Sequence, residues 1–180
     1  MHPRGAQAHS SVIGWRESID LPHWGISGLL AKSDTGALGC AIDCANIRRL
    51  KNGRICFDVV LSRRKERQVK RVTAPMGRLK RVRSSNGEVQ ERYTVLTQLR
   101  IGPVAKQVEF SLVSRKRMLC RVLLGRRALA RDFLVDSERE FLFGRRSPLA
   151  IAARPINRRD TARLITPTEA DDEPGQFEYL

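Results

Sequence analysis

Short apolar runs, alternating or continuous and separated by polar turns, extend over most of this chain. Such runs are typical of β-strands. They predict strands at residues 11–21, 26–33, 40–50, 55–62, 68–75, 77–83, 89–101 and 102–114. Asn-Gly pairs at 52–53 and 86–87 favour tight hairpins between consecutive strands. The pattern therefore predicts a mainly β fold class.

The pattern changes late in the chain. The segment "CRVLLGRRALARDFLV" begins as a buried strand, and its Ala and Leu content after Gly125 predicts a short helix that runs to about Asp132. The segment "FLVDSEREFLFG" (133–144) is expected to close the domain as a hairpin. We therefore expect a flexible N-terminus at 1–11, one folded domain at 12–144, and a disordered, proline-containing tail at 145–180.

Charge narrows the class of partner. The chain has 34 Lys and Arg against 19 Asp and Glu, a net charge of +15. Residues 145–180 contain six arginines and six acids, so the whole excess lies in residues 1–144. Such a surface attracts polyanions, including nucleic acid, the ribosome or an acidic peptide. Because the chain has no apolar run long enough to span a membrane and no signal-like leader, we expect a cytoplasmic protein without a membrane partner.

Metal and cofactor chemistry find little support. The four cysteines, at 40, 44, 56 and 120, form no C-x-x-C pair, so reduced, buried thiols are the simpler interpretation. The histidines at 2, 9 and 23 form no H-E-x-x-H motif. We expect no metal site and no cofactor.

The candidate chemistry lies at Asp34, which follows the apolar run "GISGLLA" and precedes Thr35 and Gly36. An aspartic peptidase needs a carboxylate at a sharp turn after a buried strand, paired with a second carboxylate so that the two share a proton and hold a water. Glycine lets the backbone approach the acid closely. About ninety residues later, "VLLGRRALA" (122–130) supplies the apolar-apolar-Gly run that lies beneath the catalytic loop in one-lobe aspartic peptidases.

Taken together, five segments resemble the retropepsin-like peptidases found beside ribosomal-protein glutamate ligases, a family long labelled "ATP-dependent zinc protease". These are "IGWRESIDLPHWGI" (13–26), "AKSDTGA" (31–37), "VRSSNGEVQER" (82–92), "LLGRRAL" (123–129) and "FLVDSEREFLFG" (133–144). The resemblance implies a retropepsin-like closed β-barrel lobe with one short C-terminal helix. It also implies an aspartic endopeptidase, acting in some members on glutamate tails of a ribosomal protein.

The resemblance also implies which residues act. The catalytic residues would be Asp34, Thr35 and Gly36. The 82–92 hairpin falls where a retropepsin places the flap over its substrate. The residues expected to bind substrate are Ala37, Arg83, Ser84, Ser85, Asn86, Gly87 and Arg126. The chain departs from the family after Ala37, where relatives tend to have a basic residue, Thr and Ser but this sequence has Leu38, Gly39 and Cys40.

One D-T-G segment supplies only one carboxylate, and two arrangements remain open. A symmetric homodimer would bring two copies of Asp34 together. Alternatively, a monomer would recruit Asp43 or Asp136, each of which is also a plausible structural residue.

The expected substrate is an acidic peptide or a glutamate-tailed protein. The alternative function is a non-catalytic basic β domain that contacts the ribosome or RNA; the scarcity of aromatic residues speaks mildly against base stacking.

Overall fold

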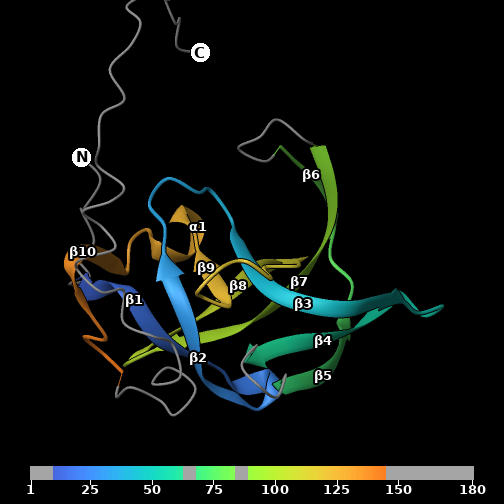
Figure 1. Ribbon diagram of the computed structural model, residues 1–180, viewed down its shortest axis with the longest axis horizontal. Coiled ribbons are helices and arrows are strands. Elements are labelled where there is room, and N and C mark those ends of the chain that lie inside the picture. Colours follow the sequence, from blue (N-terminus) through green and yellow to red (C-terminus); the bar gives the residue numbers. More distant parts are fainter. Residues whose placement is uncertain (1–9, 63–67, 84–88, 145–180) are drawn as a thin grey trace, which may run out of the picture.

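The fold is mainly β, as the sequence predicts. The computed structural model describes residues 10–62, 68–83 and 89–144, and within them it contains ten strands, one 3-10 turn and one short α-helix (Figure 1). Their bounds are β1 Ser11–Leu21, η1 Pro22–Trp24, β2 Ile26–Ser33, β3 Cys40–Arg49, β4 Arg54–Ser62, β5 Gln68–Pro75, β6 Leu79–Arg83, β7 Val89–Ile101, β8 Val104–Val113, β9 Val122–Leu124, α1 Arg126–Leu129 and β10 Phe133–Glu140.

The strands pair in an order very different from their order in the chain. The main path runs β10-β1-β2-β9-β3-β8-β7-β6, and β4 and β5 extend from β3. Three of these pairs are parallel, namely β1 with β10, β2 with β9, and β3 with β8. One further pairing joins β1 to β7 at Asp20 and Arg100, so the pairings form a ring from β1 through β7 and back. The closed barrel stays a prediction.

The placement of β9 determines where the candidate loop lies. This three-residue strand pairs with β2 on one side and with β3 on the other. The chain that leaves β2 therefore crosses the end of β9 before it returns along β3, and residues 34–39 form this crossing (Figure 1). The D-T-G loop therefore lies next to the L-L-G segment because β9 is placed between β2 and β3.

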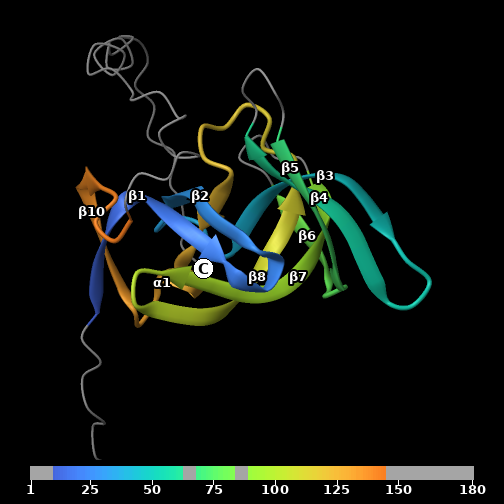
Figure 2. The ribbon, with the colours of Figure 1, turned by 90° about the horizontal axis from the view of Figure 1, so that it is seen from below.

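The core is built from the inward faces of these strands. Fully buried side chains include Ile42 of β3, Phe57 of β4, Leu99 of β7 and Phe110 of β8. Trp24 of η1 meets Phe57 edge to face, with ring centroids 5.5 Å apart and planes at 75°. Figure 2 shows the fold from below, with the curved β7 and β8 near β1 and β2. All four of these strands contribute side chains to the buried core.

Two expectations for the end of the domain are wrong. The helix ends at Leu129 and does not continue to about Asp132, because Ala130 takes an extended conformation and Arg131 has a φ of 75°. The 133–144 segment does not form a hairpin; its strand β10 pairs in parallel with β1. Strand β1, more than a hundred residues earlier in the chain, provides the backbone hydrogen bonds that a local hairpin would have provided.

No helix within the described ranges is long and apolar enough to cross a bilayer.

Strand β7 provides a matched test of the core. Leu99 is 1% exposed, whereas Leu96 on the same strand is 62% exposed. Leu99→Ala should lower the free energy of unfolding by about 2–5 kcal/mol, because it leaves a cavity in the core. Leu96→Ala should change it by less than about 0.5 kcal/mol. Urea denaturation of both variants measures the difference, and similar losses would contradict the assignment of the two faces.

Candidate active site

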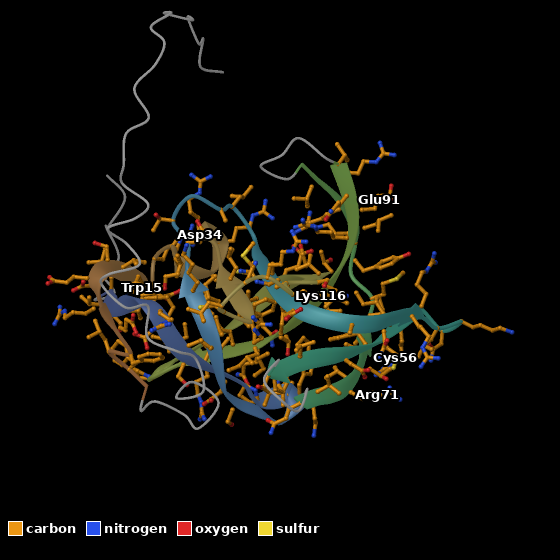
Figure 3. All side chains as sticks on the ribbon, in the orientation of Figure 1. Trp15, Asp34, Cys56, Arg71, Glu91 and Lys116 are labelled. Atoms are coloured by element: carbon orange, nitrogen blue, oxygen red, sulfur yellow. The ribbon has the colours of Figure 1, made fainter. Side chains whose placement is uncertain are left out.

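Asp34 lies immediately after β2, at the point where the chain turns (Figure 3). Its backbone N–H donates to the carbonyl of Leu124 at 2.9 Å, which continues the pairing between β2 and β9. Its Oδ1 accepts the N–H groups of Gly36 and Ala37, each at 3.0 Å. The side chain is half-buried, and no described residue donates to Oδ2. One oxygen is thus held by the backbone while the other is left for a reacting partner.

The loop is held from below by the residues after β9. Arg126 and Arg127 donate their backbone N–H groups to the carbonyls of Ala37 and Leu38, at 2.8 and 3.1 Å. These contacts require a glycine at 125, because a Cβ there would lie 2.3 Å from the Gly39 carbonyl oxygen and 2.7 Å from that of Ala37. The L-L-G-R segment therefore positions the D-T-G loop through its backbone.

The departure from the family pattern has a structural role at one position. Cys40 is buried, and its Sγ accepts the N–H of Gly125 at 3.3 Å. Burial raises the pKa of this thiol. Leu38 is exposed at the top of the loop. The thiol of Cys40 thus joins the loop to Gly125 at a position where the family resemblance predicts a hydroxyl.

The predicted site residues are only partly visible. Thr35 and Gly36 are exposed and Ala37 is half-buried, all in the loop beside Asp34. Arg126 begins α1, is exposed, and meets the loop through its backbone. Arg83 ends β6 opposite Val89. The predicted flap residues Ser84, Ser85, Asn86 and Gly87 lie outside the described residues.

A cavity of about 600 Å³ begins three residues after Asp34. One wall is the loop and start of β3, residues 37–41, and the opposite wall comes from β6, β7 and the segment after β8. The charged side chains that line it are all basic: Arg78, Lys80, Arg81, Arg92, Arg115 and Arg127. A neighbouring cavity of about 870 Å³ shares Arg92 and Arg115 with it. Figure 1 shows the 34–39 loop and the β6–β7 pair on the same side of the molecule.

None of these six basic residues is among the binding residues that the sequence predicts. Arg92 lies within the 82–92 motif, and Arg115 belongs to the basic run at 114–121. The local sequence shows only that these residues are positively charged. It does not show that β7 and the segment after β8 lie across a cavity from the D-T-G loop.

The described residues contain no group of three or more His, Cys, Asp and Glu side chains able to hold a metal ion.

The two alternative acids both contact arginine. Asp43 is fully buried, forms an ion pair with Arg121 at 2.6 Å, and accepts the backbone N–H of Arg115 at 2.8 Å. Asp136 pairs with Arg139 at 2.7 Å, and this hydrogen bond, with backbone donors, lowers its pKa from 3.8 to about 2. Each carboxylate therefore stabilises its own segment of chain.

The contact at Gly125 can be tested against a glycine in open space. Gly125→Ala should lower the free energy of unfolding by about 1–3 kcal/mol, because the new methyl group has no room beneath the loop. Gly39→Ala is the control, since a Cβ there meets nothing within 4 Å. Urea denaturation measures both; equal stability of the two variants would show that the loop does not rest on Gly125.

Glu109 provides a test by pH. Hydrogen bonds from Arg78, at 2.9 Å, and from Lys80 lower its pKa from 4.5 to about 2. Because the folded-state pKa is depressed, this stabilisation is present above about pH 4.5 and is lost as the pH falls towards 2. The urea midpoint of Glu109→Gln should therefore fall less steeply than that of the wild type between about pH 5 and 2.5. Parallel curves would contradict this assignment. Asp136 titrates in the same range in both proteins, so it does not affect the comparison.

Comparison with known proteins agrees with this geometry. Residues 12–146 match the family described as RimB-like, retropepsin-like aspartic endopeptidase RimB. A probable alpha-L-glutamate ligase from Shewanella halifaxensis is 29% identical over 143 residues, covering 78% of this chain and 31% of the ligase. A protein of the same description from Parasynechococcus marenigrum is 31% identical over 130 residues, 71% of this chain and 28% of that protein. The chain thus spans about a third of the length of these curated relatives.

A solved structure shares the fold. The crystal structure of a Legionella pneumophila protein of unknown function superposes with a TM-score of 0.63 at 22% identity, covering 76% of this chain and all of that one. The family match covers the D-T-G loop, the L-L-G-R segment and all the described strands except the first residue of β1. This chain therefore belongs to the RimB-like family of retropepsin-like aspartic endopeptidases.

Proposed function

We propose that this protein is an aspartic endopeptidase in which Asp34 provides the catalytic carboxylate. The observation that carries the proposal is the loop geometry: backbone donors hold Oδ1, and no described residue donates to Oδ2. A carboxylate of this kind, paired with a second one, shares a proton and activates a water. As the water attacks the peptide carbonyl, the ionised carboxylate takes a proton from it and the protonated carboxylate gives its proton to the carbonyl oxygen. The proton taken from the water then passes to the peptide nitrogen as the C–N bond breaks, and a diol proton returns to the dyad.

The second carboxylate comes from a second copy of the chain. Asp43 and Asp136 are engaged with Arg121 and Arg139, so neither is a good partner for Asp34. In a symmetric homodimer two Asp34 side chains meet at the two-fold axis, and Thr35, which is exposed, is available to the partner loop. Each copy contributes a retropepsin lobe with a closed barrel; the ring of pairings that returns to β1 through Asp20 and Arg100 supports this architecture.

The substrate is an acidic peptide, of which a glutamate tail on a ribosomal protein is one form. Among the residues that the structure describes, six basic side chains and no acidic one line the cavity beside the loop. The curated relatives are named as probable alpha-L-glutamate ligases, and a region similar to this chain makes up about a third of them. A peptidase associated with enzymes of that description would act on bonds that a glutamate ligase makes.

The first test is cleavage of a poly-α-glutamate peptide by the purified protein, followed by mass spectrometry. Asp34→Asn should reduce the rate by about 10³-fold or more, since the amide cannot exchange the proton. A chelator should leave the rate unchanged. Cleavage that survives in Asp34→Asn, or that the chelator abolishes, would contradict aspartic chemistry at this residue. Binding of RNA without any peptidase activity would favour the basic binding domain instead.

A mixing experiment tests the homodimer. Inactive Asp34→Asn chains added in ninefold excess should pair with most wild-type chains and lower the activity per wild-type chain by roughly tenfold, as random pairing requires. Asp34→Asn/Gly125→Ala, in which the loop is displaced, should inhibit less at the same excess. If activity per wild-type chain does not change while the chains exchange partners, each chain carries its own dyad.

A further inference from the structure

Arg92 and Arg115 lie where the two cavities meet. Arg92 belongs to β7 and Arg115 follows the end of β8, and both line the cavity of about 600 Å³ and that of about 870 Å³. Thr94 pairs with Ser111 across the antiparallel β7–β8 ladder. Residues two apart share a face of a sheet, so Arg92 lies on the face of Ser111, which also lines the smaller cavity.

Arg92 is a partly desolvated cation with unused donors. Its side chain is half-buried, and its Nη2 donates to the amide oxygen of Gln90 at 3.1 Å. Its Nε is buried and has no hydrogen-bond partner within the described part of the chain. Burial lowers the pKa of this guanidinium. A buried donor without an acceptor is unfavourable, so an incoming acceptor here would be stabilised.

Arg115 is similarly placed. It is half-buried, and its Nε donates to the carbonyl of Cys120 at 3.3 Å, which directs the guanidinium along the 114–121 segment. Burial lowers the pKa of its guanidinium. Within the described ranges, neither Arg92 nor Arg115 forms a salt bridge with a carboxylate.

Of the other four basic residues that line the cavity, three pair with carboxylates, and the fourth, Arg127, is exposed to solvent. Arg78 and Lys80 share the carboxylate of Glu109, at 2.9 and 2.5 Å. Arg81 pairs with Glu91 at 3.4 Å. These partners offset part of the positive charge on the β6 wall, whereas Arg92 and Arg115 have no such carboxylate partner among the described residues. An anion in the cavity therefore gains most beside these two arginines.

We propose that Arg92 and Arg115 bind the side-chain carboxylate of an acidic residue in the peptide substrate and so determine the specificity of the enzyme. This rests on the proposed peptidase function, since the peptide must reach Asp34. The loop residues that follow Asp34, 37–41, form the opposite wall of the same cavity, so a peptide held at the loop presents its neighbouring side chains to the pair. The planar guanidinium donates two parallel N–H groups, which match the two oxygens of a carboxylate.

Binding to an inactive enzyme tests the pair apart from catalysis. The probe is a fluorescein-labelled hexa-α-glutamate peptide, titrated with Asp34→Asn protein by fluorescence anisotropy. Adding Arg92→Gln or Arg115→Gln should raise Kd by about tenfold or more, because a charge-assisted hydrogen bond is lost. Adding Arg49→Gln removes an equal charge from the exposed end of β3 and should change Kd by less than about twofold. Arg92→Lys and Arg115→Lys should weaken binding less than the Gln variants.

Several outcomes would overturn the proposal. One is a Kd for folded Arg92→Gln and Arg115→Gln equal to that of Arg49→Gln, with thermal melting as the check on folding. Another is equal affinity for a hexaglutamine peptide, which has no carboxylate side chains. A third is loss of binding to labelled oligouridylate alone, which would assign the pair to RNA. If hexaglutamate binds through the pair but wild-type protein cleaves no peptide, the recognition pair is supported and the proposed peptidase function fails.

Discussion

The candidate site depends on one close contact, between the 34–40 loop and Gly125. The carbonyl oxygens of Ala37 and Gly39 lie where a side chain at 125 would otherwise be, and the N–H groups of Arg126 and Arg127 bond to the same loop. This is possible because β9 lies between β2 and β3, so the chain must cross its end. Packing below and backbone donors around Oδ1 together fix the Asp34 carboxylate at the surface of a rigid sheet.

Charge is distributed so that most acids near the site are already engaged. Asp43 lies in the core with Arg121, and Glu109 offsets part of the charge of Arg78 and Lys80, which line the cavity. The cavity beside Asp34 is consequently left with a positive lining, in which Arg92 and Arg115 have no carboxylate partner among the described residues. The overall charge of +15 attracts acidic chains from a distance, while the placement of individual arginines determines what binds.

The departure after D-T-G-A looks less disruptive in the structure than in the sequence. A hydroxyl is expected at position 40 from the relatives, and the thiol of Cys40 accepts the N–H of Gly125 in its place. Sulfur is a larger and weaker acceptor than oxygen, so the bond is longer, yet it pairs the buried N–H of Gly125. Leu38 points to solvent and does not affect the packing beneath the loop.

Local pattern determined much of this fold. Strands β1, β2, β5 and β7 have the predicted bounds, and Gly53, with a φ of 69°, forms the turn that the Asn-Gly pair favours, because alternation and turn chemistry act between near neighbours. Asp34, Gly36 and Gly125 were likewise found from motifs. Only the tertiary structure decided that β10 pairs with β1, that the helix stops at Leu129, and that Arg92 and Arg115 line a cavity with residues 37–41. Those outcomes depend on which strands become neighbours, and that choice is made by burial over the whole chain rather than by any local sequence.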